Sequence, residues 1–255
     1  MLSSITITHL FDNYSVRTDL QTLWGYSVLI DTPGSRILFD TGSNGRHLLN
    51  NMELMNIDLN TINSLFITHR HWDHIGGIDS ILEQLPEVNL IVPHTLSGHL
   101  ISDLKKLAAS VKVIEQEPEQ LGPHIYTTGV MASPGSSFEP EQAVVLHTGG
   151  GLVLITGCAH PGIGAMVQWA ANYFGQAPLL VMGGFHLLKS GSKQIEKEID
   201  TLKSLNVHYV APSHCTGDAA IEQFREAFQD RFIPDGAGQM IQVEGDRVSY
   251  TQLGQ

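Results

Sequence analysis

The feature that most constrains the fold of this 255-residue chain is a coarse pattern of strands and helices that occurs twice. Each occurrence opens with short apolar runs typical of strands and continues with alternating helical and strand patterns. Two such units placed face to face would bury their sheets against each other beneath outer helices. The sequence therefore predicts an α/β fold of four layers, helix–sheet–sheet–helix. We expect one domain over residues 1–255, made of two similar halves at about 1–122 and 123–255.

Turn residues and hydrophobic periodicity place the individual elements. Pro33-Gly34 lies between two apolar runs and predicts a hairpin, because proline presets φ and glycine supplies the turn. The expected strands are Ile5–Phe11, Gly25–Ile30, Arg36–Phe39, Ser64–Thr68, Val88–Val92, Val111–Ile114, Ile125–Thr128, Ala143–Leu146, Leu152–Thr156, Leu179–Met182 and Val207–Ala211. The expected helices are Arg46–Asn56, Ile78–Leu85, Leu96–Ala109, Ile163–Phe174, Ile195–Leu205 and Ala219–Phe228.

Four candidate metal ligands follow directly after the strand expected at Ser64–Thr68. His69 and His71 are two residues apart, so in an extended segment they point the same way. Asp73 and His74 come as the chain turns toward a helix, and they can face a second point. This spacing suits two metal ions held close together. Imidazole and carboxylate ligands suit zinc, with manganese and iron as alternatives.

This cluster carries a family resemblance. His69-x-His71-x-Asp73-His74, followed by Gly76-Gly77, resembles the signature of the metallo-β-lactamase superfamily, and Asp40-Thr41-Gly42 resembles the segment that ends a strand there. Three later segments resemble one subgroup, whose members are often named dihydropterin ribofuranosyl-aminobenzene phosphate synthase: Gly157–Ile163, Gly183–Leu187 and Pro212–Gly217. The resemblance covers essentially the whole chain. It implies an αββα sandwich holding two metal ions and hydrolysing esters, amides, thioesters or phosphodiesters.

The resemblance also implies ligands from the second half of the chain. His214 matches the last histidine motif, and Asp40 is expected to support the ligand loop. The usual Gly-His segment and the usual strand-ending Gly-Asp are missing, and Cys158 stands where the bridging Asp would be. His160, two residues on, is the more conventional ligand, while a thiolate at Cys158 would also bind zinc. His186 is either a further ligand or an acid that contacts the substrate.

The remaining histidines, the second cysteine and several aromatic or amide residues are assigned to packing, support or surface positions. Trp24, Tyr26 and Asn51 could line a pocket, although packing is the preferred interpretation. Cys215 is assigned to support or packing near the site. The remaining histidines lack partners at ligand spacing and are assigned to the surface or to packing; they are His9, His47, His94, His99, His124, His147 and His208. Of these, His94 is the one whose position at a strand end merits inspection.

Composition excludes several classes of partner. The net charge of −12 repels phosphate backbones, so we expect no nucleic-acid partner. No apolar run approaches the roughly 18 residues of a membrane span, and Met1–Leu10 does not resemble a signal peptide. Two cysteines beside histidines suggest reduced thiols, although one disulfide stays open. These features predict a cytoplasmic protein with a small-molecule substrate, and they leave its oligomeric state open.

The predicted function is that of a metal-dependent hydrolase. Two close cations lower the pKa of a bound water, so a metal-bound hydroxide can attack an ester, lactone, amide or phosphodiester. Asp73 would steer the nucleophile and His186 would protonate the leaving group. The alternatives are a phosphate-ester transferase or synthase acting on a pterin-like compound, a di-iron oxidoreductase, and a catalytically silent small-molecule sensor. Substrate choice is assigned to the loops Gly135–Glu141 and Lys189–Lys193.

Overall fold

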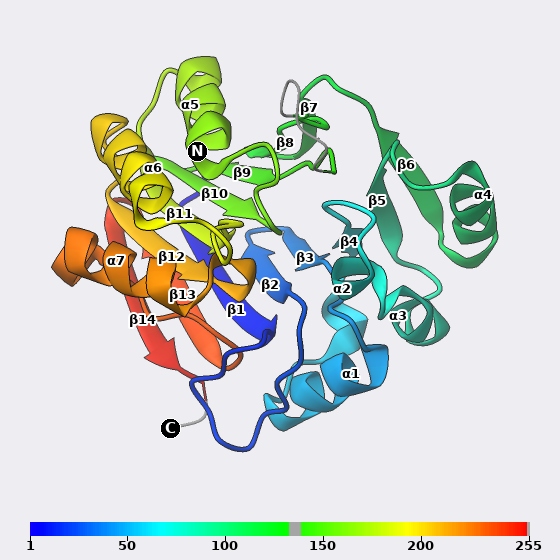
Figure 1. Cartoon of the computed structure of the whole chain (residues 1–255). Helices are drawn as coiled ribbons and strands as arrows, with labels where there is room; N and C mark the ends of the chain where they lie inside the picture. Colours follow the sequence, from blue (N-terminus) through cyan, green and yellow to red (C-terminus); the bar gives the residue numbers. More distant parts are fainter. Residues whose placement is uncertain (133–138, 254–255) are drawn as a thin grey trace.

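Two β-sheets form the centre of the computed structural model, which describes residues 1–132 and 139–253 (Figure 1). Across the first sheet the strands are β14 (Arg247–Gln252), β13 (Gln239–Glu244), β1 (Ser4–Phe11), β2 (Ser27–Thr32), β3 (Ser35–Phe39), β4 (Ser64–Phe66), β5 (Asn89–Pro93) and β6 (Ser110–Ile114). Across the second sheet they are β12 (Tyr209–Ser213), β11 (Pro178–Gly184), β10 (Leu152–Thr156), β9 (Val144–His147), β8 (Ile125–Thr127) and β7 (Glu119–Gly122).

Helices cover the outer face of each sheet (Figure 1). The first sheet packs against α1 (Gly45–Leu54), α3 (Ile78–Gln84) and α4 (Gly98–Leu107). The second sheet packs against α5 (Ile163–Phe174), α6 (Ser192–Ser204) and α7 (Asp218–Phe228). The short helix α2 (Trp72–Ile75) lies at the edge where the site forms. The expected four-layer αββα sandwich is therefore confirmed.

Alternating side chains divide the core into three apolar layers. In β2, Val28 and Ile30 face the layer between the two sheets, and Leu29 faces the helices. In β10, Ile155 faces the other sheet while Leu154 packs under the helices of the second half. This period of two is the geometry of an extended strand, with both faces covered. Each large apolar side chain buried in this way contributes roughly 1.5–3 kcal/mol.

The ends of the chain depart from the expected halves. The hairpin β13–β14 was not expected, and it extends the first sheet beside β1 rather than the sheet of its own half. β7 was also not expected, and it begins the second sheet before residue 123. β14 is exposed along most of its length, so its sequence shows little of the apolar–polar alternation that predicts a strand. The sheets therefore do not divide at residue 122.

The strand pairing determines where the site lies. β3, β4, β5 and β6 are mutually parallel, as are β10, β11 and β12. Carboxyl ends of parallel strands meet at one edge of a sheet, which is where α/β proteins bind ligands. The hairpin between β2 and β3 turns at Pro33-Gly34 as expected, with Gly34 at φ 86°. In the described part of the chain, no helix combines the length and the apolar character needed to cross a membrane.

Candidate metal centre

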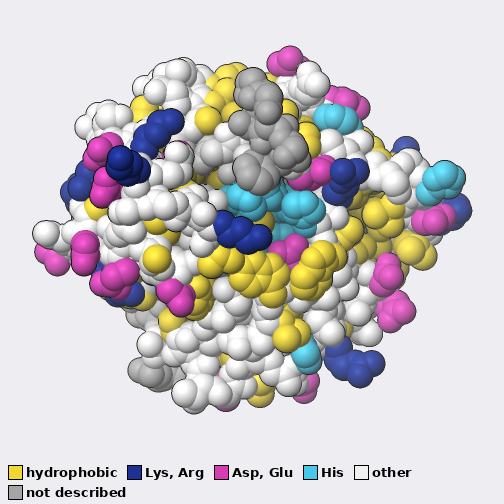
Figure 2. Space-filling view, in the orientation of Figure 1, with side chains coloured by type: hydrophobic (Ala, Val, Ile, Leu, Met, Phe, Trp, Pro, Cys, Tyr) yellow, Lys and Arg dark blue, Asp and Glu magenta, His cyan; other side chains and the backbone are white. Residues whose placement is uncertain are grey.

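The candidate ligands gather where strands of both sheets end. His69, His71, Asp73 and His74 follow β4 and run into α2. Cys158 and His160 follow β10, and His214 follows β12. Figure 2 shows histidine side chains collected near the centre of one face, bordered by hydrophobic side chains and a basic group. All seven metal ligands expected from the sequence therefore lie at one edge of the sandwich.

Three histidines form the first group. The ligand atoms of His69, His71 and His160 all lie within 4.8 Å of one another. Nε2 of His69 is 3.1 Å from Nδ1 of His71. The ring of His160 lies 4.6 Å from that of His69 and 4.9 Å from that of His71, measured between centroids. Three imidazoles that converge in this way could hold one divalent cation.

Asp73, His74 and His214 form the second group, with ligand atoms likewise within 4.8 Å. Oδ2 of Asp73 is 3.4 Å from Nε2 of His214 and 3.8 Å from Nε2 of His74. The rings of His69 and His74 have centroids 4.2 Å apart, so the two groups are adjacent. This arrangement agrees with the sequence-based expectation that Asp73 and His74 face a second point.

In three of these histidines, hydrogen bonds determine which ring nitrogen faces the centre. Thr68 donates its hydroxyl proton to Asp40 over 2.8 Å, so its oxygen accepts from Nδ1 of His69, also over 2.8 Å. Nδ1 of His74 donates to Asp40 over 2.7 Å. Nδ1 of His214 donates to the side-chain oxygen of Asn13 over 3.0 Å. Each ring therefore presents Nε2 to the centre, as metal-binding histidines do.

The site also shifts the pKa values of its members. Burial lowers the pKa of His69 well below its usual value, and the proximity of His74 lowers it further. Desolvation also lowers the pKa of His71, although its side chain is partly exposed to solvent. Burial opposes ionisation of Asp73, but contacts with His214 and His74 outweigh it and hold that pKa below its usual range. Neutral imidazoles and an ionised carboxylate are the forms that bind a cation.

Asp40 supports the ligand loop, as expected from its motif. It is fully buried at φ 53°, and its Oδ1 accepts from the backbone N–H of Thr68 over 2.8 Å. Burial lowers the pKa of His74, but the Asp40 carboxylate outweighs burial and raises it to about 9. Metal binding through Nε2 of His74 needs that nitrogen free of a proton, so a bound cation would counteract this shift.

Glu141 is a central residue of the site that the sequence did not indicate. Its Oε1 accepts from the backbone N–H groups of Gly157 and Cys158 at 2.9 Å and of Ala159 at 3.2 Å. Its Oε2 accepts from the backbone N–H of His160 at 3.1 Å and lies 2.9 Å from Nδ1 of the same residue. Burial opposes its ionisation, but His69 and His160 hold its pKa well below the usual value. A glutamate in no recognisable motif gives no sequence signal of this role.

Both cysteines belong to the centre. Sγ of Cys158 is 3.2 Å from Nε2 of His74, and it also groups with His69. It therefore lies against both histidine groups, where the resemblance places a bridging ligand. Cys215 is buried beside it. The structure thus brings Cys158 and His160 to the same centre, and both stay predicted ligands.

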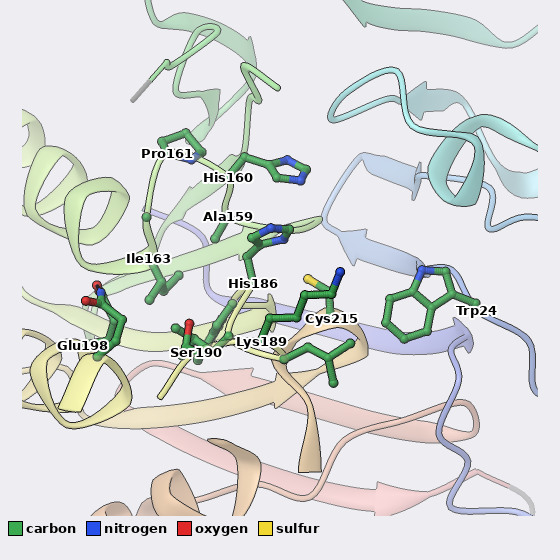
Figure 3. A pocket seen from close by; sticks show the side chains of 15 residues that line it. Trp24, Ala159, His160, Pro161, Ile163, His186, Lys189, Ser190, Glu198 and Cys215 are labelled. Atoms are coloured by element: carbon green, nitrogen blue, oxygen red, sulfur yellow. Dashed lines mark hydrogen bonds between the residues drawn. The ribbon is translucent and has the colours of Figure 1, made fainter. Parts of the chain in front are cut away.

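A pocket of about 670 Å³ opens beside the centre (Figure 3). His186 lines it, with its ring centroid 4.6 Å from that of His160. Contact with the Cys215 thiol raises the pKa of His186, and burial opposes this. Trp24 lines the pocket as well, so the preferred packing interpretation was wrong for this residue; its ring lies 4.9 Å from that of His214. Apolar side chains from the turn after β11 form much of the remaining wall.

Several other sequence assignments can be compared with the structure. Tyr26 and Asn51 are fully buried, in agreement with packing roles. His94 lies near Glu115, 3.6 Å from its carboxylate, and belongs to none of the ligand groups found among the described residues. His9 is buried between Asp12 and Asp235, so it is more than a packing residue. Most of the loop Gly135–Glu141 lies outside the described residues.

The donor set and the fold together define a class of metal-binding α/β sandwich proteins. The model of the metallo-β-lactamase superfamily matches residues 24–214. The chain is 30% identical over 262 residues to 7,8-dihydropterin-6-methyl-4-(β-D-ribofuranosyl)-aminobenzene-5'-phosphate synthase of Methanocaldococcus jannaschii, covering 85% of this chain and 89% of that protein. It is 30% identical to ribonuclease Z of Alkaliphilus oremlandii, but over only 38% of this chain and 32% of that protein.

A solved structure is similar over nearly the whole length. The crystal structure of Tm1679, described as a metal-dependent hydrolase of the β-lactamase superfamily, has a TM-score of 0.80 and 29% identity, covering 94% of this chain and 99% of that one. This chain therefore belongs to the metallo-β-lactamase superfamily and, within it, groups with the synthase-named relative. The fold implies metal ions, and the two histidine groups supply residues that could hold them.

Proposed function

We propose that this chain is a metal-dependent hydrolase of a small anionic molecule with a largely apolar body. The observation that carries the proposal is the pair of adjacent ligand groups, His69–His71–His160 and Asp73–His74–His214, beside an open pocket. The proposed cofactor is a pair of zinc ions, because imidazole and thiol donors suit zinc. When bound, such ions supply a water of lowered pKa and positive charge for a developing oxyanion.

The protein groups would perform the remaining steps. Asp73, ionised between His74 and His214, can accept a hydrogen bond from the attacking water and orient it. His186 lies on the pocket side of His160, where it can give a proton to a leaving group. The raised pKa of His186 favours the protonated form that an acid needs. These roles make Asp73 and His186 the proposed catalytic residues.

The lining of the pocket supports the substrate class. Leu187, Leu188 and Ile163 give it an apolar wall, and Trp24 adds an aromatic face. In Figure 3 the side chain of Lys189 reaches past Cys215 on the side of Trp24. Within the described residues, no carboxylate lies within ion-pair distance of the Lys189 ammonium, so it is available for an anion on the substrate. The net charge of −12 argues against a nucleic-acid substrate.

A second candidate is the synthase reaction. The relative of Methanocaldococcus jannaschii is named for a product that joins aromatic rings to a ribofuranosyl phosphate. An apolar pocket with a lysine suits such a compound as well as it suits a hydrolase substrate.

We place the protein in the cytoplasm, since both cysteines are free thiols, as a reducing compartment keeps them.

The test combines metal content and turnover. Zinc-reconstituted protein is assayed against phosphodiesters, lactones, thioesters and amides, with and without prior chelation. We expect about two zinc ions per chain and turnover that chelation abolishes and zinc restores. His160→Ala should lose metal and turnover together. Zinc binding with no turnover on any substrate, but with tight binding of a pterin-like ligand, would instead support the synthase or a silent sensor. Failure to bind any metal would overturn all metal-dependent candidates.

A further inference from the structure

The only two cysteines of the chain lie together beneath the pocket, although they are far apart in sequence. Cys158 follows β10 and Cys215 follows β12, and their Sγ atoms lie within 4.8 Å of each other. Sγ of Cys215 is also 3.6 Å from the carbonyl oxygen of Cys158. Both side chains are buried, so neither thiol is placed to react with bulky molecules.

A glycine provides the space in which the two sulfurs meet. β11 lies between β10 and β12, and its last residue is Gly184. A Cβ atom at Gly184 would lie only 2.6 Å from Sγ of Cys215 and 2.5 Å from the carbonyl oxygen of Gly157. The missing side chain therefore lets the Cys215 sulfur extend across the end of β11 toward Cys158. A disulfide needs the sulfurs at about 2.05 Å, so the two side chains must move toward each other for the bond to form.

The two thiols differ in access. Cys215 lines the pocket beside His186 and Lys189, whereas Cys158 is not part of that lining. A small oxidant entering the pocket would therefore meet Cys215 first. Cys158, directly behind it, is the only other thiol that could then react.

We propose that Cys158 and Cys215 are a modification site that a peroxide converts into an intramolecular disulfide. The Cys215 thiol reacts with hydrogen peroxide to give a sulfenic acid and water. The Cys158 thiol then displaces the sulfenic oxygen, forming the S–S bond and releasing a second water. Two electrons pass from the two thiols to the peroxide, and a dithiol reductant reverses the change.

Oxidation would also alter the metal centre. The Cys158 sulfur now lies 3.2 Å from Nε2 of His74, and in a disulfide it could no longer act as a thiolate toward a cation there. The oxidised protein is therefore expected to hold its metal more weakly. This consequence concerns metal content, so it can be measured whether or not the hydrolase proposal holds.

The experiment treats the purified, reduced chain with hydrogen peroxide and counts thiols after denaturation. We expect the count to fall from two to none, and a digest made without reductant to contain Cys158 and Cys215 in one cross-linked peptide pair. Dithiothreitol should restore both thiols. Persistence of both thiols, or oxidation of Cys215 to a sulfinic acid without a cross-link, would overturn the proposal.

Two variants test the order of reaction. In Cys158→Ser, the sulfenic acid at Cys215 has no partner, so dimedone added as the protein is denatured should trap it. In Cys215→Ser, Cys158 should remain a thiol because it does not line the pocket. Oxidation of Cys158 at an unchanged rate in that variant would contradict the assigned order. The wild-type cross-link needs neither variant, so the proposal stays testable if a variant folds poorly.

Discussion

Oε2 of Glu141 lies 2.9 Å from Nδ1 of His160, so a buried carboxylate supports a histidine of the metal centre. The same carboxylate accepts hydrogen bonds from the backbone that carries Cys158 and His160. A single acid residue thus shapes the loop after β10 and orients one of its candidate ligands. Carboxylates commonly accept a hydrogen bond from the second ring nitrogen of a metal-binding histidine and so fix the orientation of its ring.

Replacing Glu141 should weaken metal binding without removing any proposed ligand. Glu141→Gln keeps the size of the side chain but removes the charge and places an N–H₂ group among backbone donors. We expect zinc affinity to fall about 10- to 100-fold, measured by competition with a chromophoric chelator. Glu222→Gln, which removes only an exposed ion pair with Arg225 on α7, is the matched control. Equal zinc affinity in the two variants would remove Glu141 from the metal centre.

Lys189 should select for an anionic substrate. Lys189→Met keeps the length of the side chain and removes its charge from the pocket. We expect KM for an anionic substrate to rise roughly tenfold while kcat changes little, since a hydrogen bond to a charged group contributes on the order of 1.5 kcal/mol or more. KM for a neutral analogue should be unchanged. Lys193→Met, on α6 outside this pocket, should match the wild type with both substrates. A similar effect in both variants would indicate a general charge effect instead.

His9 should make stability depend on pH in the alkaline range. Burial lowers its pKa, but Asp235 and Asp12, at 2.8 and 3.0 Å, outweigh burial and raise it from 6.5 to about 10. Because the folded pKa exceeds the unfolded one, this stabilisation is complete below pH 6.5 and is lost as pH rises through about 10. Urea unfolding at a series of pH values should therefore show the free energy of unfolding declining over this window.

Asp235→Asn provides the comparison for His9. With one carboxylate removed, the folded pKa of His9 should lie lower, so the loss of stability should begin at a lower pH. The variant should also be less stable at pH 7, by about 1.5–3 kcal/mol, because one hydrogen bond to a charged group is lost while Asp12 still pairs with His9. An alkaline decline with the same midpoint in both proteins would assign the effect to other groups.

Gly184 should tolerate no side chain. In Gly184→Ala, the new Cβ would approach Cys215 Sγ and the Gly157 carbonyl oxygen at distances that require the structure to shift. We expect a loss of about 1–3 kcal/mol in the free energy of unfolding, typical of overpacking. Gly191→Ala is the matched control, because a Cβ there meets nothing within 4 Å. Equal stability of the two variants would show that the end of β11 is not tightly packed.

Much of the architecture could be predicted because local patterns determine it. Strand alternation, Pro33-Gly34 at the hairpin and helical periodicity such as that of Ile163–Phe174 gave the observed elements with small shifts at their ends. The cluster from His69 to His74 predicted a metal centre, because four donors at that spacing have few other uses. β13 and β14 escaped prediction altogether, since β14 is largely exposed and no local pattern says which sheet an edge hairpin joins.

Only the tertiary structure decided which residues outside the recognisable motifs complete the centre. The sequence by itself determined the donors that are close together in the chain, since their spacing is a local property. Glu141 and Asn13 carry no motif of their own, and they reach the ligands only because parallel strands and the loops around them meet at one edge. The pKa values of residues at this edge then depend on desolvation and on neighbouring charges. No local sequence pattern specifies either of these influences.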